Sequence, residues 1–163
     1  MIDGGKADLT RYPARKGFED LVMIVSEQGE APFAWTACVL DGYVWFSLKK
    51  ASDFPATLLW ISNGGRHSEP WNGGHLKRLG LEEVCSYFCD DVEDSRRDLL
   101  GSKEIPTTRE FDGSAVALKL IQAVATVSDR FDIVAEILPK EGGVELVSQS
   151  GVRVEVPLEW EFL

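Results

Sequence analysis

The chain has 163 residues, 44% hydrophobic and 27% charged, a balance typical of one globular domain over residues 1–163. Its 17 basic and 27 acidic residues give a formal charge of −10, which disfavours a nucleic acid or an anionic membrane as partner. No window approaches the roughly 18 consecutive apolar residues of a membrane span, and residues 1–6 contain no apolar stretch typical of a secretion signal, so a soluble, unexported protein is expected. Cys38, Cys85 and Cys89 match no zinc or redox spacing, so reduced thiols in a cytoplasmic protein are expected.

Strand signals dominate the first half of the chain. Stretches rich in Val, Ile, Phe or Trp, each bounded by Gly, Pro or Asp, predict strands over residues 18–25, 33–40, 43–48 and 58–62. Asp41-Gly42 lies between two of these stretches, and such a dipeptide between apolar runs is a strong hairpin signal. The sequence therefore predicts a hairpin over residues 33–48.

The second half continues the same pattern with one polar interruption. Residues 79–88 are predicted to form a strand, and residues 90–100, acidic early and basic late, a short surface helix or ordered loop. Residues 114–127 could be helical, but their β-branched side chains and strand neighbours favour a strand. Short strands separated by glycine turns follow over residues 131–138, 143–148 and 152–160. Regular short strands predict an all-β sandwich or barrel.

The segment from Leu58 to His75 has the composition of a binding or catalytic site. It contains both histidines, two of the five tryptophans, an arginine and two Gly-Gly pairs. Such groups donate, accept or transfer protons at neutral pH. The spacing of His67 and His75 matches no short metal motif, so proton transfer or hydrogen bonding is favoured over metal binding, with surface or capping histidines as the alternative.

Two adjacent carboxylates lie in the predicted strand over residues 79–88. Strand alternation places Leu81 and Glu83 on one face and Glu82 and Val84 on the other. Both faces are largely apolar, so at least one carboxylate should be poorly hydrated, which disfavours its ionised form. Such a carboxyl can act as a general base near neutral pH, although the residues alone favour a structural role.

Aromatic side chains near the same loop, including Trp60, Trp71 and Tyr87, suit a sugar as the ligand. The C–H faces of a sugar are apolar, whereas its hydroxyls need hydrogen-bond partners. Trp35 and Trp45, in contrast, are expected in the core. The side chains expected to bind substrate are those of Trp60, Asn63, Arg66, Trp71, Asn72 and His75.

Three stretches resemble the aldose 1-epimerase-like (galactose mutarotase-like) proteins. They are LWISNGGRH at 59–67, PWNG at 70–73 and GLEEVCSY at 80–87, and the similarity extends to residues 8–13 and 17–20. The resemblance covers only the later half of the usual β-supersandwich of that family. It therefore implies an all-β sandwich that corresponds to part of the galactose mutarotase-like fold.

The resemblance also implies a chemistry. In that family a glutamate removes the proton of the anomeric hydroxyl while a histidine protonates the ring oxygen, so that the sugar opens and recloses. The match at Gly80-Leu81-Glu82 implies that Glu82 is the base, and that Glu82 is less hydrated than Glu83 and titrates higher. The acid histidine of the family belongs to the half that this chain lacks, and His67 is the candidate catalytic histidine here.

The expected function is aldose-1-epimerase-like binding of a monosaccharide or sugar phosphate, with anomer interconversion if an acid is supplied and with no cofactor or metal. One alternative is a non-catalytic carbohydrate-binding or regulatory module. Another is a structural β-domain that completes its fold with a separate chain. Because half of a large sandwich exposes sheet edges and an apolar face, a homodimer is expected.

Overall fold

The computed structural model describes residues 6, 8–12, 15–27 and 29–163, and its strands form three antiparallel sheets of three strands each. Sheet A has the order β1-β4-β5 and consists of β1 (Phe18–Val25), β4 (Ala56–Asn63) and β5 (Arg78–Val84). Sheet B has the order β2-β3-β6 and consists of β2 (Ala34–Leu40), β3 (Tyr43–Lys49) and β6 (Leu120–Thr126). Sheet C has the order β7-β8-β9 and consists of β7 (Val134–Lys140), β8 (Gly143–Ser148) and β9 (Arg153–Pro157).

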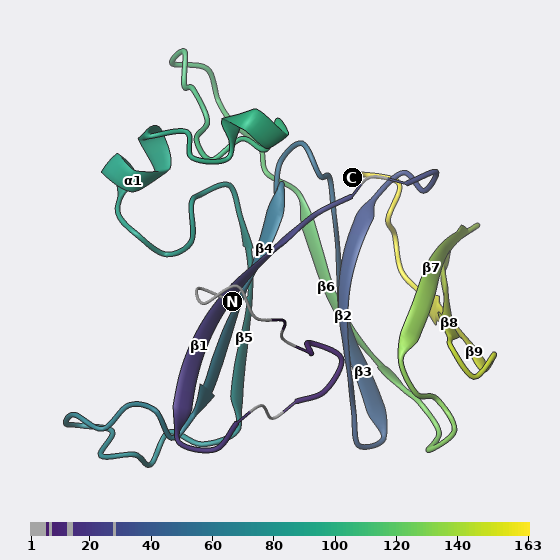
Figure 1. The fold of residues 1–163 in the computed structure, drawn as a ribbon. Coiled ribbons are helices and arrows are strands. Elements are labelled where there is room, and N and C mark those ends of the chain that lie inside the picture. The colour runs from purple at the N-terminus through teal and green to yellow at the C-terminus, as the bar shows by residue number, and fades with distance from the viewer. Residues whose placement is uncertain (1–5, 7, 13–14, 28) are drawn as a thin grey trace.

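Sheet B lies between the other two sheets (Figure 1). The only helical pieces in the described part of the chain are the single turn α1 (Val92–Arg96) and the short 3-10 helix η1 (Gly101–Lys103). Both follow sheet A in the sequence and lie beyond the end of β5 (Figure 1). The predicted all-β, sandwich-like class is therefore confirmed.

Most predicted strands are confirmed, with shifted ends. The hairpin over 33–48 is present as β2 and β3, and Gly42 has the positive φ of 78° that this tight turn requires. The strand predicted over 79–88 stops at Val84, so the next residues turn away from sheet A. The strand predicted over 114–127 is confined to β6, because Ser114 to Lys119 pair with no strand.

Sheets B and C enclose the apolar core. Alternation along β3 directs Val44, Phe46 and Leu48 towards sheet C, and all three are fully buried. Their buried neighbours in this cluster are Phe33, Val127, Phe131, Val134, Ile137, Val144 and Leu146. Burying each of these larger apolar side chains contributes about 1.5–3 kcal/mol to folding.

The interface between sheets A and B contains a buried polar cluster. The same alternation directs Ser47 and Lys49 of β3 towards sheet A, where Lys49 Nζ pairs with Glu83 Oε2 of β5. Thr57 Oγ1 lies 2.5 Å from Lys49 Nζ and 2.7 Å from Glu83 Oε2, and Ser47 Oγ donates to Glu83 Oε1 at 2.5 Å. Burial lowers the pKa of Lys49, although the Glu83 carboxylate opposes that shift. A buried charge is tolerated when it is paired and hydrogen-bonded, as both charges are here.

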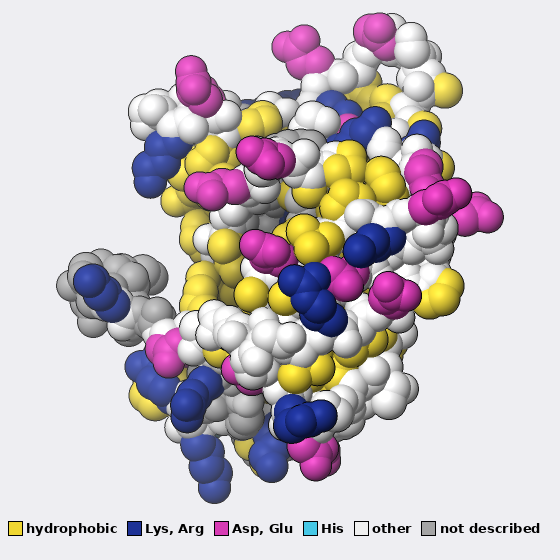
Figure 2. Space-filling model, turned by 90° about the vertical axis from the view of Figure 1, so that its right-hand side faces the viewer, with side chains coloured by type: hydrophobic (Ala, Val, Ile, Leu, Met, Phe, Trp, Pro, Cys, Tyr) yellow, Lys and Arg dark blue, Asp and Glu magenta, His cyan; other side chains and the backbone are white. Residues whose placement is uncertain are grey.

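The face of sheet C that points away from sheet B is charged. Arg153 Nη1 and Lys140 Nζ lie 2.5 and 3.8 Å from Glu145 Oε2. Figure 2 views the molecule from this side and shows Lys, Arg, Asp and Glu side chains spread over it.

Across the described ranges, no helix has both the length and the apolar character needed to cross a membrane.

Candidate functional site

The candidate site lies on the face of sheet A that points away from sheet B. Since Thr57 of β4 faces sheet B, alternation directs Trp60 to the opposite, outer face. In the strand register Trp60 lies opposite Leu21 of β1 and Gly80 of β5. Gly80 has no side chain, so the Trp60 ring can lie over this part of the sheet.

An ion pair fixes the polar groups beside Trp60. Glu19 of β1 accepts hydrogen bonds at Oε1 from Trp60 Nε1 at 2.6 Å and from Arg66 Nε at 2.5 Å. The Arg66 guanidinium also lies over the Trp60 ring, 4.6 Å from its centroid. Burial raises the pKa of Glu19, but the hydrogen bonds from Arg66 and Trp60 outweigh it, and the net pKa is lowered.

His75 lies between the two indoles of the site. Its ring stacks on Trp60 with centroids 5.2 Å apart and planes at 23°, and its centroid lies 4.7 Å from that of Trp71. His75 Nδ1 is 2.7 Å from Ser62 Oγ, the next outward-facing residue of β4. Because Nδ1 has this partner, Nε2 is the ring nitrogen that remains for a bound molecule.

The loop over residues 64–77 needs its glycines to place Arg66. A side-chain carbon at Gly65 would lie 2.3 Å from the backbone nitrogen of Glu19, so the loop packs directly against β1 only with glycine there. Gly64, with φ of 90°, donates from its backbone nitrogen to the His75 carbonyl at 2.9 Å. The Gly73 backbone nitrogen donates to the Arg66 carbonyl at 2.7 Å. The loop is therefore closed across its base and held against sheet A.

Glu82 borders the same surface on the β5 side. A side-chain carbon at Gly80 would lie 3.3 Å from Trp60 Cβ and 3.4 Å from both Trp60 Cε3 and Glu82 Oε1. The carboxylate and the indole therefore approach one point above Gly80. Glu82 is exposed and lines the same pocket as Glu19 and Arg66.

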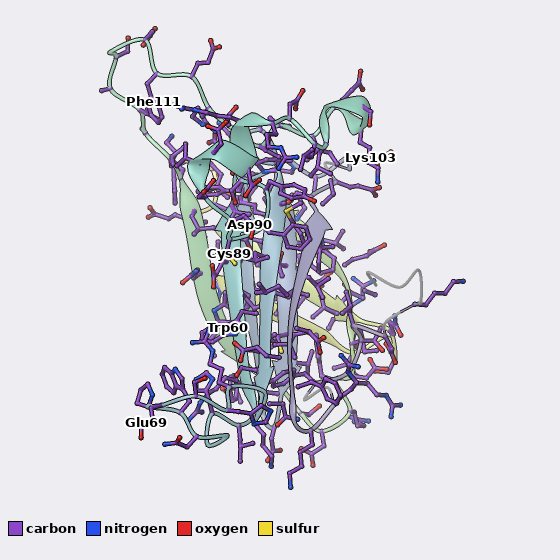
Figure 3. The ribbon with its side chains drawn as sticks, turned by 60° about the vertical axis from the view of Figure 1, so that its left-hand side comes forward. Trp60, Glu69, Cys89, Asp90, Lys103 and Phe111 are labelled. Carbon is purple, nitrogen blue, oxygen red and sulfur yellow. The ribbon has the colours of Figure 1, made fainter. Side chains whose placement is uncertain are left out.

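The segment after β5 forms the far end of this pocket. Residues 87–90 line it together with Trp60 and Glu82. Figure 3 shows Cys89 and Asp90 in front of the strands on one side of Trp60, and Glu69, in the loop over residues 64–77, on the other. The same pocket also extends to the sheet B side, where residues 35–41 and 131–134 line it. We refer to its part along the outer face of sheet A, between the two loops, as the outer hollow.

The expected order of hydration of the two adjacent glutamates is wrong. Glu83 has a side chain only 1% exposed, whereas Glu82 is exposed. The physical reason is the direction of alternation: the inward position meets Lys49, which stabilises a buried carboxylate there. Glu82, selected by the family resemblance, is still the carboxylate on the side of the hollow.

Of the residues predicted to form the site, Trp60, Arg66, Trp71 and His75 are brought together. Glu82 borders this cluster at Gly80, and the remaining predicted residues lie apart from it. Asn63 is buried, and its Oδ1 accepts a hydrogen bond from the Lys77 backbone nitrogen at 3.3 Å, which helps to close the loop. Both Asn72, with φ of 47°, and His67 are exposed. Tyr87 packs on Phe88 with ring centroids 5.2 Å apart.

Sequence reasoning missed Glu19, which contributes the shared acceptor of the site. Glu19 precedes Arg66 by 47 residues, and only the pairing of β1 with β4 brings it beside Trp60. Residues 17–20 belong to the quoted family resemblance, but no feature of that stretch assigned a role to this carboxylate. Only the register of β1 and β4, which places Glu19 opposite Ser62, identifies Glu19 as a residue of the site.

Within the described residues, no group of three or more His, Cys, Asp or Glu side chains is arranged to hold a metal ion. Comparison of the chain with protein-family models, with curated proteins and with solved structures gave no match. The resemblance to aldose 1-epimerase-like proteins therefore stays a prediction.

Proposed function

We propose that the outer hollow of sheet A binds a carbohydrate, either a monosaccharide or a sugar phosphate. The observation that carries this proposal is the cluster of Trp60, His75 and Trp71 beside the Arg66–Glu19 ion pair. Apolar ring faces next to fixed polar groups match a ligand whose C–H faces are apolar and whose hydroxyls need partners.

Trp71 is the stacking surface in this proposal. Both indoles contact His75 and Arg66, but Trp71 is 41% exposed, whereas Trp60 is partly buried. An exposed indole on a loop that is hydrogen-bonded across its base offers a large, rigid contact area at little entropic cost. Trp60 then orders its neighbours rather than covering the ligand.

The polar partners lie around that indole. Glu19 accepts both of its described side-chain hydrogen bonds at Oε1, so Oε2 is directed to ligand hydroxyls in this proposal. Arg66 uses Nε for Glu19, and its terminal nitrogens are suited to a hydroxyl or a phosphate. This arrangement supports both a neutral and a phosphorylated sugar.

Anomer interconversion is a second candidate function at the same site, supported by Glu82 and His75, which both lie beside Trp60. Glu82 would take the proton of the anomeric hydroxyl while protonated His75 gives a proton from Nε2 to the ring oxygen. The bond between the anomeric carbon and the ring oxygen then breaks, and rotation about the C1–C2 bond presents the other face of the aldehyde. Reversal of the proton transfers then closes the ring as the other anomer. His75 replaces His67 as the acid in this proposal, because His75 contacts the indoles of the site.

We propose the reducing cytoplasm as the compartment. The three cysteines of the chain, Cys38, Cys85 and Cys89, are all free thiols. Free thiols persist where glutathione and thioredoxin keep them reduced, whereas proteins of oxidising compartments form disulfides.

Calorimetric titration with glucose, galactose and their 6-phosphates tests the binding proposal. At least one of these should bind saturably, and Trp71→Ala should weaken binding about tenfold or more, equivalent to about 1.4 kcal/mol. Tyr43→Ala is the matched control, because Tyr43 is an aromatic residue of sheet B, 40% exposed and outside the site, and its removal should leave binding unchanged. Absence of binding at millimolar sugar, or equal binding by Trp71→Ala, would overturn the proposal.

A further inference from the structure

Strand β6 forms an edge of sheet B, and β3 is its only strand neighbour in the described part of the chain. Its sequence, LIQAVAT, contains no charged residue and no proline. Natural edge strands usually carry such residues, because an open edge otherwise pairs with another strand. The absence of these protective residues makes β6 an unusual edge.

The other sheet edges of this protein differ from β6. Edge strands β1 and β5 both contain acidic residues, and β7 and β9 contain Pro139 and Pro157. Strand β2 is also uncharged, but it lies against β7 of sheet C. Strand β6 is therefore an uncharged edge strand that, unlike β2, has no strand of another described sheet lying against it in this manner.

The register of β3 and β6 identifies the open backbone groups. The Val127 backbone nitrogen donates to the Gly42 carbonyl at 3.0 Å, so residue 127 points its backbone groups towards β3. Alternation directs those of residues 121, 123 and 125 the same way. The N–H and C=O groups of Leu120, Gln122, Val124 and Thr126 point outward, and no backbone hydrogen bond to them is present among the described residues.

We propose that β6 pairs antiparallel with β6 of a second copy of this chain, around a two-fold axis at Ala123. In this register Leu120 lies opposite Thr126 of the second copy, and Gln122 lies opposite Val124 of the second copy. These are hydrogen-bonded pairs, since all four residues present their backbone groups outward. Each copy then pairs all of its open β6 groups, and the two sheets B become one continuous sheet.

The side chains fit this register. Gln122 and Val124 share a face, and Val124 is 60% exposed in the single chain, so pairing would cover an apolar surface. No charged side chain of β6 lies opposite another, although each chain carries a net charge of −10. The pairing is isologous and occupies the β6 edge of both copies, so it closes at a dimer instead of growing into a fibre.

Light scattering after size exclusion, at micromolar protein, tests the assembly. The wild-type chain should be a dimer, and Val124→Lys should be a monomer with an unchanged circular dichroism spectrum, because a charge at an exposed edge opposes pairing. Val124→Pro should act alike, since the Val124 N–H does not bond β3. Val92→Lys is the control: Val92 is 66% exposed on α1, and its substitution should leave the dimer intact.

Disulfide trapping tests the register. The two-fold axis places Ala123 opposite itself in a non-hydrogen-bonded pair, with Cα atoms about 4.5 Å apart, within the span of a disulfide. Oxidised Ala123→Cys should form a covalent dimer, whereas Ala125→Cys, which lies opposite residue 121, should match the wild-type background. A monomeric wild-type chain, a dimer that survives both Val124 substitutions, or equal cross-linking at 123 and 125 would overturn the proposal.

Discussion

Lys49 of β3 and Glu83 of β5 form an ion pair that joins sheets A and B, and each side chain is only 1% exposed. Thr57 and Ser47 hydrogen-bond to this pair from two further positions. The pair therefore fixes the position of β5 relative to sheet B. The neighbouring Glu82 is consequently directed to the outer face, where the candidate site lies.

Removal of one partner of the Lys49–Glu83 pair should destabilise the protein, because the other charge then stays buried without a counter-charge. Lys49→Met leaves the Glu83 carboxylate buried without its cation, and we expect the free energy of unfolding to fall by about 3–5 kcal/mol. Urea denaturation monitored by circular dichroism measures it. The double substitution Lys49→Met with Glu83→Met should recover much of the loss, because no buried charge remains. A loss below about 1 kcal/mol in the single variant would contradict a buried, paired arrangement.

Glu19 should make the protein sensitive to acid. Its folded-state pKa lies below the ordinary value of 4.5, so the stabilisation is complete above that pH and is lost as pH falls through the folded-state pKa. Glu19→Gln cannot ionise and should lack this part of the dependence. Urea midpoints for both proteins between neutral and acidic pH should therefore converge in that window. Parallel curves down to the acid transition would show that Arg66 and Trp60 do not stabilise the carboxylate.

Gly80 should be required for the shape of the hollow. A larger side chain there meets Trp60 and the Glu82 carboxylate within 3.4 Å, so Gly80→Val must displace one of them. We expect sugar binding about tenfold weaker, or about 1.4 kcal/mol, in a protein that still folds. Gly29→Val is the control for adding a side chain, because a carbon there meets no atom within 4 Å. Unchanged binding by Gly80→Val would place the ligand elsewhere.

Substitution of Glu82 should affect activity, whereas substitution of the adjacent Glu83 should affect stability. Glu82 is exposed, so Glu82→Gln should change the free energy of unfolding by no more than about 0.5 kcal/mol, while abolishing any anomer exchange. Glu83→Gln should instead destabilise the protein, since it leaves Lys49 as an uncompensated buried charge. Polarimetry on freshly dissolved α-glucose and α-galactose measures the exchange. Exchange that persists in Glu82→Gln would remove Glu82 from the base role.

The sequence by itself determined the local parts of this protein. Asp41-Gly42 specified the hairpin of β2 and β3, and the glycine turns specified β8 over Gly143–Ser148, because turn chemistry and strand patterning act over a few residues. The same holds for part of the site: Trp60, Arg66, Trp71 and His75 lie within 16 consecutive residues, so one strand and one loop bring them together.

Only the tertiary structure decided which long-range partners these residues meet. Strand alternation in the sequence already places Glu82 and Glu83 on opposite faces of the strand. The burial of Glu83, however, depends on Lys49, which lies 34 residues earlier and in another sheet. Likewise, Glu19 joins Trp60 and Arg66 only through the register of β1 with β4. Register and sheet packing are set by the burial of whole faces and by the pairing of buried charges, and these depend on contacts that no local pattern contains.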